Sequence, residues 1–155
     1  MIGRVYLFAA VCLMGMFSAS GADAFGRDDR WVSGWGQGLS EAAVTRGPGN
    51  RIYVSCDDDP NLSASTISFS LAGKQSTGSS ITLTFDRADP QRFSLWPGGE
   101  VPSNCRACAS NFDGILAGFR RHRSVHVMFE NGDSTRFTLR QSSKALNGCV
   151  ADFYQ

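Results

Sequence analysis

Residues 67–95 read ISFSLAGKQSTGSSITLTFDRADPQRFSL, and apolar side chains alternate with hydroxyl side chains through most of this stretch. A period of two places successive side chains on opposite faces of a β-strand. The RADP segment at residues 87–90 is typical of a turn. We therefore predict a meander of antiparallel strands, each with one buried and one solvated face. The alternating apolar positions are Ile67, Phe69, Leu71, Ile81, Leu83, Phe85, Phe93 and Leu95.

The same pattern continues on both sides of this stretch. Upstream, residues 41–46 and 51–56 read as short strands, joined by the turn sequence GPGN. Downstream, apolar residues alternate around Asn131 and Gly132, and an Asn-Gly pair is the strongest short signal for a β-hairpin. The flanking apolar positions are Ile52, Val54, Val125, Val127, Phe129, Phe137 and Leu139.

One segment, residues 110–122 (SNFDGILAGFRRH), breaks the alternation. Its apolar residues recur at helical spacing, which predicts an amphipathic helix with one apolar stripe. Ser110 and Asp113 resemble a capping box at its start. Gly114 and Gly118 allow a close approach to the sheet. The predicted stripe consists of Phe112, Ile115, Leu116 and Phe119.

These elements predict a mainly β fold: an antiparallel sandwich or meander of about seven or eight strands with one packed α-helix, braced by disulfides. Residues 41–155 are expected to form this single domain. Residues 25–40 read as an extended lead-in, rich in glycine, charge and tryptophan. Within the lead-in, Trp31 and Trp35 are expected to cap one end of the core.

The first 24 residues are typical of a cleaved export signal. Arg4 precedes an apolar run that is too short to span a bilayer, and the Ala-Asp-Ala triplet ending at Ala24 fits a signal-peptidase site. We expect the protein in the periplasm, with secretion as the alternative. In an oxidising compartment, the four cysteines after the signal are expected to form disulfides.

The charge balance argues against some classes of partner. The chain carries a net charge of +1, and loss of Arg4 and Asp23 with the signal leaves that charge unchanged. A nearly neutral protein gives no support for a nucleic-acid partner. No later segment is apolar enough to cross a membrane. We expect no cofactor and no metal.

The four cysteines allow three pairings, of which we favour Cys56 with Cys149 and Cys105 with Cys108. A local C-x-x-C closes easily, and the other two cysteines then remain at strand and chain ends. The alternative role for Cys105 and Cys108 is a redox pair near a helix start, where Arg106 would lower a thiol pKa. Redox motifs of this kind usually lie in a βαβ unit, so a structural pair is the preferred interpretation.

Other polar clusters are candidate sites, each with a simpler structural explanation. The DDDP segment at residues 57–60 has three carboxylates, but it lacks the spacing of a calcium loop and reads as a solvated turn. Residues 100–108 are a candidate binding loop, with Glu100, Asn104 and Arg106 as its contacts. Arg120, Arg121 and Arg123 are candidate anion-binding residues, or simply a solvated helix end.

The two histidines, His122 and His126, are four residues apart across a helix-to-strand junction. Neither has the neighbouring cysteines or carboxylates of a zinc site. His126 is expected on the solvated face of its strand. No nucleophile motif is present, and we predict no catalytic residues.

The last third of the chain, NCRACASNFDGILAGFRRHRSVHVMFENGDSTRFTLRQSSKALNGC at residues 104–149, resembles small periplasmic proteins of the invasion-associated-locus-B type. It is also similar to periplasmic accessory proteins of type VI secretion. The positions that carry the likeness are Cys56, Phe137, Leu139, Ala145, Leu146 and Cys149. The resemblance implies a Gram-negative periplasmic β-sandwich-like domain and no enzyme activity.

The expected function is that of a non-enzymatic periplasmic accessory factor, which binds another protein or a component of the envelope. Two alternatives belong to other classes. One is an inhibitor of an exported enzyme such as lysozyme, acting through the loop at residues 100–108. The other is a thiol–disulfide oxidoreductase acting through Cys105 and Cys108.

Overall fold

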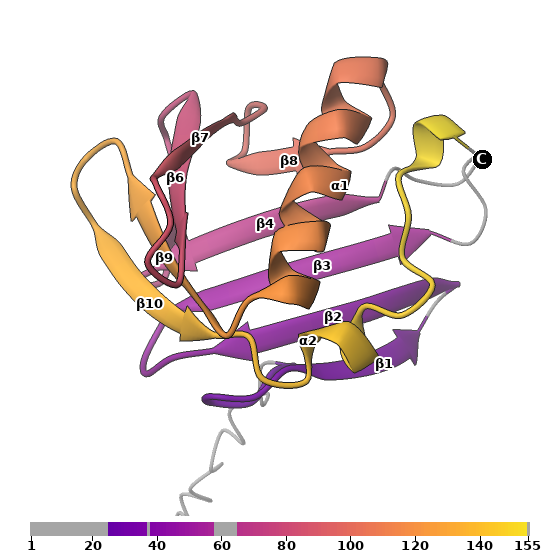
Figure 1. Cartoon of the computed structure of the whole chain (residues 1–155), viewed down its shortest axis with the longest axis horizontal. Helices are drawn as coiled ribbons and strands as arrows, with labels where there is room; N and C mark the ends of the chain where they lie inside the picture. Colours follow the sequence, from indigo (N-terminus) through magenta and orange to yellow (C-terminus); the bar gives the residue numbers. More distant parts are fainter. Residues whose placement is uncertain (1–24, 37, 58–64, 155) are drawn as a thin grey trace, which may run out of the picture.

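The computed structural model describes residues 25–36, 38–57 and 65–154. The expectations for the export signal and for Asp58, Asp59 and Pro60 lie outside these residues. Antiparallel strands in two sheets dominate the described chain, with one long helix (Figure 1). The elements are β1 (Val32–Gly36), β2 (Leu39–Thr45), β3 (Arg51–Asp57), β4 (Thr66–Leu71), β5 (Lys74–Gln75), β6 (Ser80–Phe85), β7 (Gln91–Ser94), β8 (Glu100–Pro102), α1 (Arg106–Arg121), β9 (Ser124–Phe129), β10 (Ser134–Thr138), α2 (Ser142–Ala145) and the 3₁₀ turn η1 (Asp152–Tyr154).

The larger sheet contains six strands in the order β1-β2-β3-β4-β5, with β8 also paired to β4. Its register sets Val44, Ile52 and Phe69 side by side on one face, and all three are buried. The opposite face carries the intervening polar residues, such as Tyr53 opposite Ser68. Period-two alternation therefore produces one buried and one polar face, as predicted.

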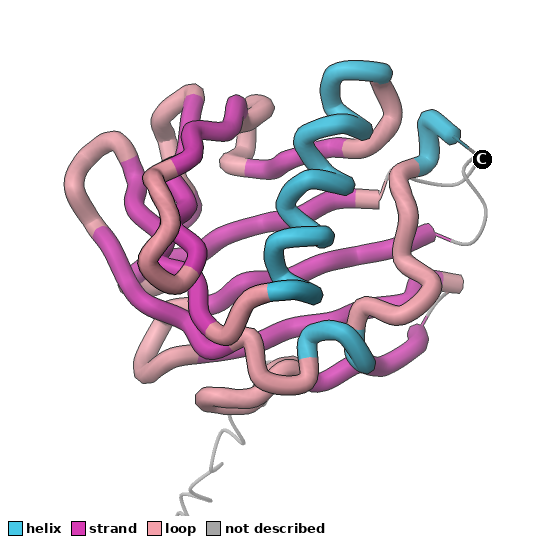
Figure 2. The backbone as a smooth tube through the Cα atoms, viewed as in Figure 1, coloured by secondary structure: helices cyan, strands magenta, loops and turns pink. Residues whose placement is uncertain are grey.

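The smaller sheet has the order β10-β9-β6-β7. Strands β9 and β10 form the hairpin predicted from Asn131 and Gly132, with Gly132 at a φ of +91°. Strand β6 pairs with β9, so α1 lies between two paired strands in the sequence. Figure 2 shows α1, α2 and this smaller sheet over the same face of the larger sheet.

Helix α1 begins four residues earlier than predicted. Cys105 is its N-cap, and the Cys105 Sγ accepts the N–H of Cys108 at 3.1 Å. The capping box expected at Ser110 is therefore wrong, because the short cap side chain that satisfies a free N–H belongs to a cysteine. At the other end, the Ser142 hydroxyl lies 2.6 Å from the Phe119 carbonyl oxygen, so α2 satisfies part of the last turn.

The core confirms the apolar stripe of the helix and the apolar faces of the strands. Phe119 is buried and packs against Trp31, with ring centroids 5.4 Å apart. A Cβ at Gly118 would lie 2.4 Å from the Phe85 ring, so glycine is what allows helix and sheet to meet there. The buried cluster includes the expected core residues Phe69, Leu83, Phe119, Val127 and Phe137.

The predicted lead-in is wrong in one respect, because it contributes a strand. Strand β1 pairs with β2, so the sheet starts at Val32 and the domain does not begin at residue 41. Trp31 caps the core as expected, and its indole N–H donates to the Thr138 carbonyl at 3.2 Å. Trp35 does not cap the core, because its side chain is 72% exposed on the edge strand β1.

Both predicted disulfides are confirmed. Cys56 at the end of β3 bonds to Cys149 near the chain's end, 93 residues away, and Cys105 bonds to Cys108. The first bond joins the larger sheet to the segment that follows α2. The second is local to the start of α1.

A buried hydrogen-bond cluster closes the same end of the molecule. The Asp152 carboxylate accepts the hydroxyls of Ser65 at 2.6 Å and Ser103 at 2.7 Å, and it also accepts the Ser65 N–H. The Ser65 oxygen accepts the N–H of Asp57 at 3.0 Å. Asp57 is buried as the last residue of β3, so the solvated turn expected at residues 57–60 is wrong for this residue.

Candidate anion-binding site

The three arginines predicted from the helix end have different surroundings. Arg120 is not available to a ligand, because its Nη2 donates to the carbonyls of Leu146 and Cys149 at 2.7 and 2.6 Å. The long side chain follows the helix towards α2, and its charge satisfies backbone oxygens inside the fold. Arg121 and Arg123 are exposed. Arg123 lines a cavity.

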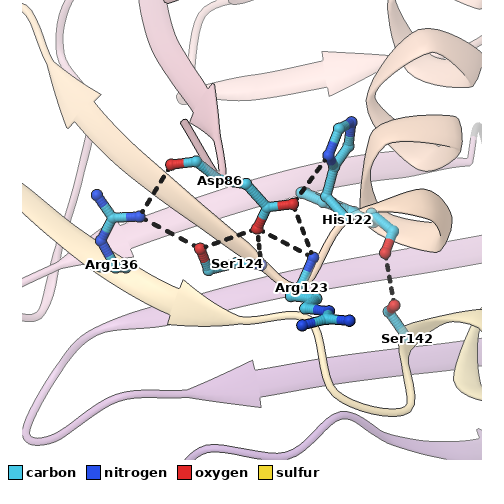
Figure 3. Close-up of polar contacts among 7 residues, drawn as sticks. Asp86, His122, Arg123, Ser124, Arg136 and Ser142 are labelled. Carbon is cyan, nitrogen blue, oxygen red and sulfur yellow. Dashed lines mark hydrogen bonds and ion pairs between the residues drawn. The ribbon is translucent and has the colours of Figure 1, made fainter. Parts of the chain in front are cut away.

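Asp86 organises the junction between β6, α1 and β9 (Figure 3). It follows β6 with a φ of +47°, a left-handed conformation that aspartate tolerates better than most residues. Its carboxylate accepts the N–H groups of Arg123 at 3.1 Å and Ser124 at 2.9 Å. It also accepts the Ser124 hydroxyl at 3.2 Å and contacts His122 Nδ1 at 3.0 Å.

These donors set the ionisation of Asp86. Desolvation alone would raise its pKa, but the hydrogen bonds from the Arg123 N–H, the His122 ring and Ser124 outweigh it. The pKa of Asp86 is therefore held below its ordinary value of 3.8. The carboxylate is anionic at neutral pH and fixes the backbone from which Arg123 projects.

The histidines do not form a catalytic arrangement. The ring of His122 stacks on Phe85, with centroids 5.1 Å apart, and its Nδ1 is directed at Asp86. The Ser124 hydroxyl contacts the same carboxylate, and His122 forms no hydrogen bond with it. His126 lies in β9, in register with Thr84 and Arg136 on the polar face of the smaller sheet.

A cavity of about 230 Å³ opens beside this junction. Arg46 enters from the turn after β2, Arg123 from the segment after α1, and Arg136 from β10. The remaining lining residues are Asp29, Ser124, Phe137 and Thr138. Arginines from three separate elements therefore line one open hollow.

The partners of the three guanidinium groups differ. Arg46 forms an ion pair with Asp29, and Arg136 donates to the Asp86 carbonyl at 3.4 Å and the Ser124 hydroxyl at 3.2 Å. The Arg123 guanidinium has no hydrogen bond or ion pair within the described residues. The cavity thus holds one unneutralised cation beside a second that contacts only neutral oxygens, which favours an anionic group.

The candidate loop at residues 100–108 is mostly not a loop. Glu100 belongs to β8, and the next three residues are buried. Pairing of β8 with β4 draws this segment into the sheet. Asn104 and Arg106 are exposed at the start of α1, so they remain accessible but do not protrude on a loop.

The sequence missed several members of the arginine cavity. Sequence patterns single out neither Arg46 nor Arg136, and they do not indicate that Asp86, which positions the Arg123 backbone, lies beside the cavity. Arg46 and Asp29 meet because Asp28 forms an isolated parallel bridge with Thr45, the last residue of β2. No periodicity in the sequence predicts this bridge. One feature of the sequence could have indicated this site: Asp86 is a polar residue directly after a buried strand.

Some site types have no counterpart in the described residues. There, no three histidine, cysteine, aspartate or glutamate side chains gather as a metal would require. None of the helices described has both the length and the apolarity of a membrane crossing.

Comparison with known proteins gives a single kind of match. The model of the YfjT family aligns with residues 29–146, which include every described strand and the helix α1. No curated protein and no solved structure matches the chain.

Proposed function

This chain belongs to the YfjT family, and we propose that it is a non-enzymatic binding protein whose ligand carries a phosphoryl or carboxylate group. The observation that carries this proposal is the cavity lined by Arg46, Arg123 and Arg136. Guanidinium groups bind phosphate and carboxylate oxygens through paired hydrogen bonds.

The proposed location is the periplasm, and the proposed partner is another periplasmic protein or a component of the envelope. Two features support this: the export-type signal sequence and the two disulfides, which persist in oxidising compartments. The resemblance to periplasmic accessory proteins is a further, sequence-based reason. Phosphoryl groups occur on envelope lipids and on small anions, so the test must separate these sources.

Calorimetry with two probes tests the proposal. Pyrophosphate represents a free anion, and vesicles with and without phosphatidylglycerol represent a lipid surface. We expect saturable binding to at least one anionic probe, weakened by added salt as screening requires. Binding to pyrophosphate alone assigns a small anion, and binding only to the anionic vesicles assigns a lipid headgroup.

A matched pair of variants locates the binding. Arg123→Ala should weaken binding about tenfold, which corresponds to about 1.4 kcal/mol. Arg121→Ala removes the same charge from the exposed end of α1, outside the cavity, and should change the affinity less than twofold. Equal losses in both variants, or no binding to either probe, would contradict the proposal.

Thiol–disulfide exchange is a second candidate function, favoured by one observation. Cys105 caps a helix of 16 residues, and backbone N–H groups at that position stabilise a thiolate. An insulin-reduction assay with thioredoxin as the reference tests it. Turnover that disappears in Cys105→Ser would support the redox function, and absence of turnover would leave the bond a structural one.

A further inference from the structure

Trp96 lies just after β7, at the end of the smaller sheet where β9 finishes at Phe129, whereas the arginine cavity lies where β9 begins at Ser124. It is 48% exposed, yet its backbone is fixed. The Trp96 N–H donates to the Glu100 carbonyl at 2.8 Å, and the Gly99 N–H donates to the Trp96 carbonyl at 3.0 Å. A large aromatic side chain thus remains in solvent on a closed turn.

The turn packs tightly against the segment before β6. A Cβ at Gly99 would lie 2.9 Å from the Ser76 carbonyl oxygen, and the φ of Gly99 is +77°. Only glycine fits both conditions. The spacing between Trp96 and the serine-rich segment at residues 76–79 is therefore set by the fold.

Two hollows border that serine-rich segment. One, of about 370 Å³, is lined by Trp96, Pro97, Leu95 and the segment itself. The other, of about 240 Å³, adds Glu130 and Asn131 from the β9–β10 turn. Ser76, Thr77 and Gly78 line both. The two neighbouring hollows share the wall formed by residues 76–78, with Trp96 lining one and Glu130 lining the other, and we call the pair the Trp96 cleft.

The carboxylate of Glu130 is held in place from one side. Its Oε1 accepts the Ser80 hydroxyl at 2.6 Å and Arg92 Nη2 at 2.8 Å. These hydrogen bonds lower the pKa of Glu130, so it is anionic at neutral pH. Its Oε2 lies beside Gly78, 2.3 Å from where a Cβ would be. Gly78 thus leaves room for this second oxygen next to the cleft.

We propose that the Trp96 cleft binds a neutral oligosaccharide. A sugar ring has an apolar C–H face, which suits an exposed indole, and a rim of hydroxyls, which need fixed donors and acceptors. The cleft is lined by Trp96, by the exposed residues Thr77 and Ser79, and by Glu130. This site is separate from the arginine cavity and does not depend on the function proposed for it.

Intrinsic fluorescence and calorimetry of the full chain test this proposal. The probes are neutral tetrasaccharides of β-linked N-acetylglucosamine, β-linked glucose and α-linked glucose. We expect at least one to bind with a dissociation constant of about 1 mM or tighter. Trp96→Ala should weaken that binding at least tenfold and abolish the change in emission.

Trp35→Ala is the matched control, because Trp35 is the other strongly exposed tryptophan and lies in the other sheet. It should leave affinity unchanged, and so should Arg123→Ala. Trp96→Phe should retain part of the binding, and Glu130→Gln should weaken it several-fold. The proposal is overturned if no probe saturates by 10 mM, a bound about tenfold above the expected constant, or if Trp96→Ala binds as well as Trp35→Ala.

Discussion

Asp152 and Asp86 lie in different parts of the molecule, and each carboxylate accepts at least one serine hydroxyl and at least one backbone N–H. Asp152 is buried and accepts only neutral donors, from Ser65 and Ser103. Asp86 is half-exposed, and the backbone that it fixes carries Arg123 into solvent. Carboxylate hydrogen bonds therefore hold the end of the chain at Asp152, whereas at Asp86 they position the guanidinium of Arg123, which is unpaired among the described residues.

The long-range disulfide also distinguishes the Asp152 cluster from the arginine cavity. The Cys56–Cys149 bond lies near the Asp152 cluster, since Cys56 precedes Asp57 and Cys149 precedes η1. The arginine cavity has no disulfide among its lining residues. We conclude that substitutions around Asp152 should affect mainly stability, whereas substitutions at the cavity should affect mainly binding.

The largest stability effect is expected from the long-range disulfide. Replacing Cys56 and Cys149 together by serine should lower the free energy of unfolding by about 4–5 kcal/mol, because the bond restricts a long loop in the unfolded chain. The Cys105–Cys108 bond closes a loop of only a few residues, so the matched double variant at these two cysteines should lose only about 2 kcal/mol. Denaturant unfolding of both variants checks the difference. Equal losses would show that loop length does not govern their stability.

The second-largest loss of stability is expected in the core that α1 shares with both sheets. Phe119→Ala should cost about 3–5 kcal/mol, because Phe119 is fully buried between Trp31 and Phe85. The measurement is again denaturant unfolding. A loss well under about 1 kcal/mol, a value typical of surface positions, would mean that α1 does not dock on the sheets.

A smaller loss is expected at Asp152. Asp152→Ala leaves the buried hydroxyls of Ser65 and Ser103 without their acceptor and should cost about 2–3 kcal/mol. Asp152→Asn keeps one acceptor oxygen and should lose less. If the alanine variant unfolds at the same denaturant concentration as the wild type, this cluster does not hold the chain's end.

Asp86 should produce a pH-dependent effect. Its pKa is lower in the folded protein than its ordinary value of 3.8, so its contribution is complete above that value and is lost as pH falls through the folded pKa. Asp86→Asn should therefore be less stable than the wild type at pH 7, and the difference should shrink in acid. Thermal unfolding from pH 7 to pH 2.5, a range that extends below the ordinary value of about 3.8 for an aspartate, checks this. A constant difference would contradict the assignment.

Local patterns predicted most of the fold but only part of the candidate site. Alternation located β3, β4, β6 and β9, and helical spacing located the stripe containing Phe119, because these signals repeat within a few residues. The pairing of β1 with β2 was missed, since glycine and tryptophan obscure the alternation in residues 32–36. Of the three cavity arginines, only Arg123 stood out in the sequence, because Arg46 and Arg136 approach it through long-range packing.

An NMR titration with pyrophosphate compares the two clusters most directly. We predict saturable shifts of the backbone amides of Arg123, Ser124 and Thr138, which lie at the cavity, and unchanged amides at Ser65, Ser103 and Asp152. Saturable shifts at the buried cluster without shifts at the cavity would contradict the assignment of binding to the arginines.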